Sequence, residues 1–169
     1  GYSAGNQGVK RQRNPIGTDV QANHLLVIGA GGSLNRLLAH LRDARPAGWV
    51  VEYCDEPANC EDKLAPHDGR HWADAVVIGP DHALPFGSAR RIHELDPTVN
   101  ILFLVPGRRA GQYSQMLVYN PQAGSIVMRD EDTPLEALTE TLLETVNGTR
   151  RNRSHESEWP HTIERRRSD

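Results

Sequence analysis

The sequence predicts an α/β domain in which helices cover both faces of a five-stranded parallel sheet. Five short apolar runs lack a polar–apolar alternation, which is typical of parallel strands that are buried on both faces. Segments with a helical spacing of leucine separate the runs, and right-handed crossovers then place helices on both sides of the sheet. A chain of 169 residues with 37% hydrophobic content is long enough for one such core, whereas a second domain would be cramped.

The expected elements alternate along the chain. The strands are expected at residues 25–28, 49–53, 75–78, 101–105 and 125–128. Stripes at helical spacing predict that the first helix buries Leu34, Leu37, Leu38 and Leu41, and that the last buries Leu135, Leu138, Leu142 and Val146. Two further helices are expected at residues 86–95 and 112–120, because a proline follows each of these segments and stops a helix.

The ends of the chain differ in composition from its middle. Residues 1–23 are rich in glycine, asparagine, glutamine and basic side chains without an apolar period, which predicts a disordered segment. The last helix is expected to begin after Thr133-Pro134 and to end at Asn147-Gly148, because glycine usually follows a helix C-terminus. The domain is therefore expected over residues 24–147, and residues 148–169 are expected to form a flexible basic linker or tail.

Charge and composition exclude several function classes. Residues 25–146 carry 10 Lys and Arg against 17 Asp and Glu, so the core lacks the basic face that direct nucleic-acid binding needs. No apolar run approaches the roughly 20 residues that span a bilayer, and the N-terminus has no hydrophobic signal region. We therefore expect a cytoplasmic protein that does not enter a membrane. In that compartment Cys54 and Cys60 are expected to stay reduced.

Over residues 25–146, the order, lengths and loop positions of these elements resemble the receiver domain of two-component response regulators. In that family the first strand ends in an acidic pair that binds Mg²⁺, and here Val27-Ile28 is followed by Gly29-Ala30. The third strand of the family ends in the phosphoacceptor aspartate, and here the strand at 75–78 is followed by Gly79. The resemblance implies a flavodoxin-like, doubly wound sheet with strand order 2-1-3-4-5.

The residues that would carry the family's chemistry are absent. Phosphoryl transfer to a carboxylate needs a nucleophilic aspartate, a divalent cation held by carboxylates, and groups that bind the transferring oxygens. The expected positions hold Gly29 and Ala30 for the acidic pair, Gly79 for the acceptor, Val105 for the hydroxyl and Arg129 for the lysine. Asp81 lies two residues beyond the acceptor position, but a lone loop carboxylate is a poor substitute. The resemblance therefore implies a pseudo-receiver that is not an enzyme and uses no cofactor or metal.

Pseudo-receivers generally act as docking or dimerisation modules within sensor kinases, transcription activators and other multidomain signalling proteins. The resemblance thus implies a protein partner or a homodimer, with further signalling domains attached. In receivers, the usual partner surface is made by the fourth helix, the fifth strand and the fifth helix. The expected interaction face consists of Tyr113, Met116, Leu117, Tyr119, Arg129, Glu136 and Glu140. Its apolar helix and charged rim are typical of a protein interface.

Two other interpretations use some of the same residues. Gly29-Ala30-Gly31-Gly32, between a strand and a helix, favours a Rossmann-like site in which Gly29, Gly31, Gly32 and Ser33 bind a nucleotide or phosphate ligand. The third glycine of that fingerprint is replaced by Leu34, so a tight turn is the preferred interpretation. Cys54, Cys60, His67 and His71 are suitable zinc ligands, but the spacing of the cysteines is not that of a common zinc motif.

Overall fold

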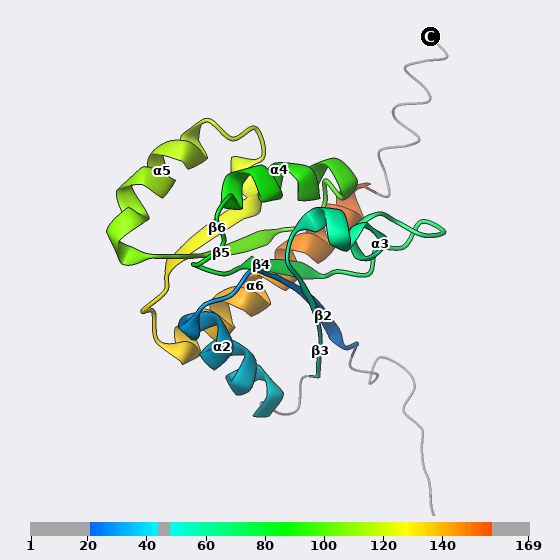
Figure 1. Cartoon of the computed structure of the whole chain (residues 1–169). Helices are drawn as coiled ribbons and strands as arrows, with labels where there is room; N and C mark the ends of the chain where they lie inside the picture. The colour runs from blue at the N-terminus through cyan, green and yellow to red at the C-terminus, as the bar shows by residue number, and fades with distance from the viewer. Residues whose placement is uncertain (1–20, 44–47, 157–169) are drawn as a thin grey trace, which may run out of the picture.

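The computed structural model describes residues 21–43 and 48–156 (Figure 1). In this part of the chain, five strands form one parallel sheet: β2 (Asn23–Ile28), β3 (Trp49–Cys54), β4 (Ala75–Ile78), β5 (Ile101–Val105) and β6 (Ile126–Asp130). Their spatial order is β3-β2-β4-β5-β6, which is order 2-1-3-4-5 when the strands are counted along the chain. The prediction of a doubly wound, flavodoxin-like α/β domain is confirmed.

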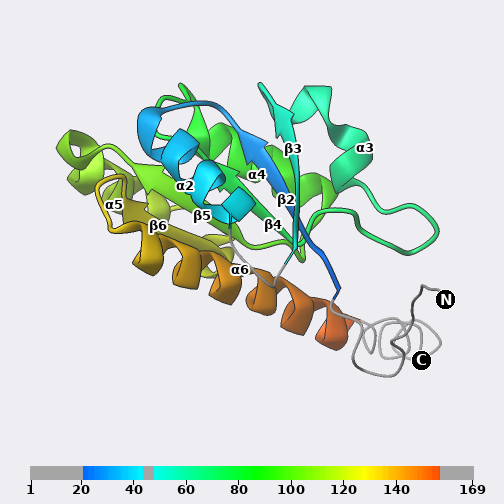
Figure 2. The ribbon, with the colours of Figure 1, turned by 90° about the horizontal axis from the view of Figure 1, so that it is seen from below.

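Helices cover both faces of the sheet (Figures 1 and 2). One face carries α2 (Gly32–Asp43) and α6 (Leu135–Glu156), and the other carries α3 (Glu61–Leu64), α4 (Pro85–Leu95) and α5 (Ala110–Val118). None of the helices within the described residues combines the length and the apolar composition that crossing a bilayer requires.

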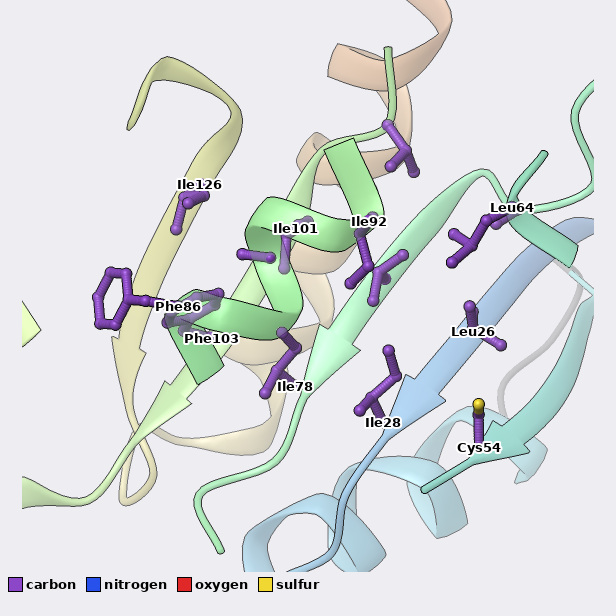
Figure 3. Packing of buried hydrophobic residues seen from close by; sticks show 14 of the residues in the cluster. Leu26, Ile28, Cys54, Leu64, Ile78, Phe86, Ile92, Ile101, Phe103 and Ile126 are labelled. Carbon is purple, nitrogen blue, oxygen red and sulfur yellow. The ribbon is translucent and has the colours of Figure 1, made fainter. Parts of the chain in front are cut away.

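Alternate residues of the central strands supply the two hydrophobic layers. Leu25 and Val27 of β2 pack with the leucine stripes of α2 and α6. Leu26 and Ile28 belong to the other layer, and Figure 3 shows them in the cluster that includes Phe86 of α4. Because successive side chains of a strand point to opposite faces, one apolar run serves both layers.

The two outer strands depart from the prediction of strands that are buried on both faces. Every residue of β4 and β5 is buried, whereas β3 and β6 form the sheet edges and are largely exposed or half-buried. On β3, the exposed side chains include Val50 and Tyr53. A short apolar run in the sequence therefore predicts a strand, but it does not tell whether the strand lies at the centre or at the edge of the sheet.

The last helix, α6, continues past its expected end at Asn147 and ends at Glu156. Gly148 is buried within this helix, where an added Cβ would overlap the side-chain amide of Asn100. The glycine therefore allows close packing and does not end the helix. The predicted boundary at residue 147 is wrong, since residues 148–156 belong to the folded domain and not to a flexible linker. Residues 157–169, and residues 1–20 of the expected disordered segment, lie outside the described residues.

Polar contacts join the last turns of α6 to the amino-terminal edge of the sheet. The Arg153 guanidinium donates to the Ala73 carbonyl oxygen at 2.6 Å and to Asp96 Oδ2 at 2.9 Å. Asn152 donates to the Thr98 carbonyl oxygen at 2.9 Å. Asp96 is fully buried, so the guanidinium supplies the opposite charge that a buried carboxylate needs. Arg153 also pairs with Asp74 Oδ1 at 3.4 Å. We call Asp74, Asp96, Thr98, Asn152 and Arg153 the α6 anchor.

Candidate functional site

The carboxyl ends of β2 and β4 lie side by side at the centre of the sheet. The chain leaves β2 toward α2 on one face and leaves β4 toward α4 on the other (Figure 1). In open α/β sheets, such a switch point is the usual location of a ligand site. The structure brings Gly29, Ala30 and Gly79 together here, and the Gly79 N–H donates to the Ile28 carbonyl oxygen at 2.9 Å.

The backbone of the β2–α2 turn occupies the space beside Gly79. A Cβ on Gly79 would overlap the carbonyl oxygen of Ala30 and would lie 2.9 Å from Leu34 Cδ2. The Ala30 carbonyl oxygen is held in place, because it accepts a hydrogen bond from the Asp81 N–H at 3.2 Å. The position that corresponds to the phosphoacceptor therefore has no room for a side chain.

The β4–α4 loop packs directly against the glycine-rich turn. Gly29 and Gly31 have φ angles of 89° and 138°, a conformation that favours glycine. A Cβ on Gly31 would lie 2.6 Å from Pro80 Cγ and 3.6 Å from Asp81 Oδ2. The glycines thus permit the close approach of the β4–α4 loop to the turn. The carboxylate of Asp81, which lies nearby, would repel a phosphate group. Of the residues in the Rossmann-like interpretation, Gly29 is half-buried, Gly31 and Ser33 are buried, and Gly32 is exposed.

An open hollow of about 420 Å³ lies beside the turn. Its lining comes from the end of β3 and from the loops that follow β2, β3 and β4: Gly29, Ala30, Tyr53, Cys54, Asp55, Asp81, His82 and Ala83. His82 Nε2 lies 2.7 Å from Ser88 Oγ, and burial lowers the pKa of His82 below its ordinary value. Folding therefore favours the neutral imidazole. Tyr53 and His82 belong to no sequence motif, and only the fold brings them to this hollow.

The two remaining positions of the receiver-like site lie on β5 and β6. Val105 is buried at the end of β5. Arg129 is exposed on the edge strand β6, and its Nη1 donates to the Met128 carbonyl oxygen at 2.9 Å. Arg129 borders two hollows, one of about 430 Å³ beside α6 and one of about 180 Å³ beside α5. Arg129 does not line the hollow beside Gly29. Its side chain is instead part of the surface around β6.

Tyr113 is buried, which contradicts its prediction as part of an exposed face. Its side chain is 2% exposed and packs edge-on against Phe86 and Phe103, with ring centroids 5.5 and 6.2 Å apart. Burial raises the pKa of the Tyr113 phenol, because the charged phenolate would lose its hydration. Tyr113 therefore fastens α5 to the core and is not part of an exposed face.

The exposed apolar residues of this segment lie at the C-terminal end of α5. Met116 is 43% exposed, Val118 76% and Tyr119 85%, whereas Leu117 is half-buried against the core. We call Met116, Val118 and Tyr119 the α5 patch. Val118 was not among the residues that the sequence analysis predicted for this face.

The charged part of the expected face is exposed. Arg129 lies on β6, and Figure 1 shows α5 and α6 on either side of this strand. Glu136 and Glu140 are exposed in the first turns of α6. The side chains expected on the interaction face thus occur on neighbouring elements at one edge of the sheet.

The candidate zinc ligands are not arranged as a metal site. Cys54 Sγ and Cys60 Sγ lie 2.7 and 3.8 Å from the Glu56 carbonyl oxygen, and burial raises the pKa of the Cys60 thiol. His71 Nδ1 lies 3.2 Å from Asp96, and His67 Nε2 contacts a backbone carbonyl oxygen. No group of three His, Cys, Asp or Glu side chains in residues 21–43 and 48–156 is placed to hold a metal ion.

Comparison with known proteins identifies similar folds. No protein-family model matches the sequence, and no curated protein matches it. Among solved structures, an adenylate cyclase from Rhodopirellula baltica is similar over 85% of this chain and 98% of its own, with 10% identity and a TM-score of 0.56. The response regulator LqsR of Legionella pneumophila is similar over 79% of this chain, with 12% identity and a TM-score of 0.55, and the match spans 47% of LqsR. At these identities the likeness shows the fold alone, which is receiver-like.

Proposed function

We propose that this chain is a receiver-like signalling module that is not phosphorylated and acts through protein contacts, as part of a larger sensor kinase or transcription regulator. The packing of the Ala30 carbonyl oxygen against Gly79 carries this proposal, because it leaves no space for an acceptor side chain. Phosphoryl transfer also needs carboxylates that hold Mg²⁺, and neither Gly29 nor Ala30 supplies one. The module is therefore proposed to be non-catalytic.

We expect no covalent phosphorylation when the chain is incubated with acetyl phosphate and Mg²⁺. Acetyl phosphate donates a phosphoryl group to an aspartate that is assisted by bound Mg²⁺, and the closed acceptor position offers neither group. Intact-mass spectrometry is expected to show only the unmodified mass. A phosphoryl adduct that persists in Asp55→Asn and disappears in Asp81→Asn would identify the loop carboxylate as an acceptor and overturn the proposal.

The α5 patch supports action through protein contacts. Met116, Val118 and Tyr119 expose apolar side chains at the C-terminal end of α5. Ala110 and Ser114, earlier in the same helix, line the hollow of about 180 Å³ at Arg129. A small apolar centre next to charged side chains is the usual composition of a protein interface, in which burial gives affinity and charge gives specificity. The proposed partner is another protein or a second copy of this chain.

Met116→Asp and Tyr119→Asp are expected to leave the domain folded and to weaken its contact with a partner. Each exposed substitution is expected to change the free energy of unfolding by less than about 0.5 kcal/mol. Tyr113→Asp is the matched comparison in the same segment, and it is expected to cost more than about 3 kcal/mol because it places a carboxylate in the core. Urea unfolding followed by circular dichroism measures these changes in stability, and sedimentation velocity measures self-association. Unfolding by Met116→Asp or Tyr119→Asp would assign the patch to the core.

The hollow beside the glycine-rich turn supports a second candidate, a sensor of a small ligand. Its carboxylates, Asp55 and Asp81, and the close packing of Pro80 on Gly31 disfavour a phosphate-bearing ligand. Ligands that bind only the folded state raise its melting temperature by mass action. A saturable rise with ATP or NAD, abolished by Gly31→Val, would favour this candidate over a protein-contact module.

A further inference from the structure

No other described element covers the outer side of α6 (Figure 2), and this side carries a stripe of polar residues. The stripe consists of Glu136, Glu140, Glu144, Asn147, Arg151 and His155, all of which are exposed. Their spacing of three or four residues places them on one side of the helix. Leu138, Leu142 and Val146 face the core from the opposite side. We call the six exposed residues the α6 stripe.

Charge is segregated along the α6 stripe. Its first half carries Glu136, Glu140 and Glu144, and its second half carries Arg151 followed by His155. The helix dipole favours acidic side chains in the first turn only, so it accounts for Glu136 and not for the other two glutamates. Like charges four residues apart on a helix repel one another. The acidic half is therefore unfavourable unless cations from elsewhere approach it.

No ion pair among residues 21–43 and 48–156 neutralises the charges of the α6 stripe. Arg150 donates to Asn23 Oδ1 at 3.0 Å, and Arg153 pairs with Asp96 at 2.9 Å. Arg151 lies between Arg150 and Arg153 in the sequence. Neither Arg151 nor Glu140 forms an ion pair with another residue that the structure describes. Arg151 and Glu140 therefore remain available for charges on another molecule.

We propose that two copies of this chain associate through an antiparallel pair of α6 helices. A two-fold axis near the middle of the α6 stripe places Glu140 of one copy opposite Arg151 of the other, and the symmetry repeats this contact. In the same register, Glu136 faces His155 and Glu144 faces Asn147 of the second copy. The three glutamates of each copy then lie opposite Asn147, Arg151 and His155 of the other, and Arg151 supplies the positive charge at neutral pH. The inference rests on the proposed action through protein contacts, and it assigns a second copy of the chain to the α6 stripe, a surface separate from the α5 patch.

The charge pattern also selects the direction of the pair. In a parallel pair, Glu136, Glu140 and Glu144 would face the same residues of the second copy, and like charges would repel. Leu143, which is 38% exposed at the border of the α6 stripe, adds an apolar contact near the axis of the antiparallel pair. Exposed ion pairs are individually weak and are screened by salt, so a dimer of modest affinity that weakens in high salt is expected.

The test reverses the charge of Glu140 in one variant of the full chain and the charge of Arg151 in another, and then mixes the two variants. Glu140→Arg and Arg151→Glu, each alone, are expected to raise the dimer dissociation constant roughly tenfold or more, because both intermolecular pairs become repulsive. An equimolar mixture of the two variants is expected to form a heterodimer with the affinity of the unmodified chain, since every arginine then faces a glutamate. Sedimentation velocity measures association, and circular dichroism checks the fold.

Arg90→Glu is the matched control, because Arg90 is an exposed arginine on α4, away from the α6 stripe, and its reversal is expected to leave dimerisation unchanged. A monomeric chain at its highest soluble concentration would overturn the inference. Dimerisation that survives both single reversals, or a mixture that does not dimerise, would also overturn it. All three results leave the proposed function standing with another partner or face. Phosphorylation by acetyl phosphate would remove the proposed function whatever the oligomeric state.

Discussion

We expect Gly79→Ala to lower the free energy of unfolding by about 3 kcal/mol, a large part of the stability of a typical domain. The added methyl group would overlap the Ala30 carbonyl oxygen, and Leu34 Cδ2 would lie 2.9 Å from it. The carbonyl group cannot move away without weakening its hydrogen bond from Asp81 N–H. Urea unfolding followed by circular dichroism measures the loss.

Gly111→Ala is the matched control for this substitution. Gly111 lies in α5, and an added Cβ would meet no atom within 4 Å outside the helix's own backbone. Alanine is therefore expected to stabilise the helix by up to about 1 kcal/mol. A Gly79→Ala variant as stable as the unmodified chain would show that the turn moves easily, and the steric argument for a closed acceptor position would fail.

Arg153→Ala is expected to have the second large effect, a loss of about 3 kcal/mol in the free energy of unfolding. The substitution leaves the fully buried Asp96 carboxylate without the guanidinium that now lies 2.9 Å away. It also removes the donors to the Ala73 carbonyl oxygen and to Thr98 Oγ1. Removing one partner of a buried pair is costly because the remaining charge stays desolvated.

Two further variants test whether the loss of stability comes from the buried pair with Asp96 or from removing any arginine side chain. Arg90→Ala removes an exposed arginine from α4 and is expected to change the free energy of unfolding by less than about 0.5 kcal/mol. Asp96→Asn is expected to recover part of the loss in the Arg153→Ala background, since it removes the buried charge that has lost its guanidinium partner. A change below about 1 kcal/mol for Arg153→Ala itself would show that the α6 anchor contributes little to stability.

The fold was predictable because its strands are short apolar runs, a local pattern that needs no tertiary information. The observed bounds of β4 and β5 match the expected ones. The end of α6 was mispredicted because Gly148 resembles a helix-ending glycine, whereas its actual role depends on Asn100, which is distant in sequence. The α6 anchor was missed for the same reason, since Asp96 and Arg153 meet only in the folded chain.

The candidate site was predictable as a set of positions but not as a shape. Matching the strand ends to the receiver pattern placed Gly29, Ala30 and Gly79 together, and the fold brings them to one point. A glycine is equally compatible with an open or a filled site, so the sequence does not reveal the contact with the Ala30 carbonyl oxygen. Tyr113 was misplaced because one helical position can face either the core or a partner.

The α6 anchor also has a mechanical consequence. Arg153 and Asn152 join the last turns of the helix to the segments that precede β4 and β5, so α6 is attached to the sheet at its far end as well as along its leucine stripe. A pull or a twist applied at Glu156 would therefore reach the strands before the last turns unwind. The orientation of the last turns of α6 is therefore fixed by contacts with the segments that precede β4 and β5.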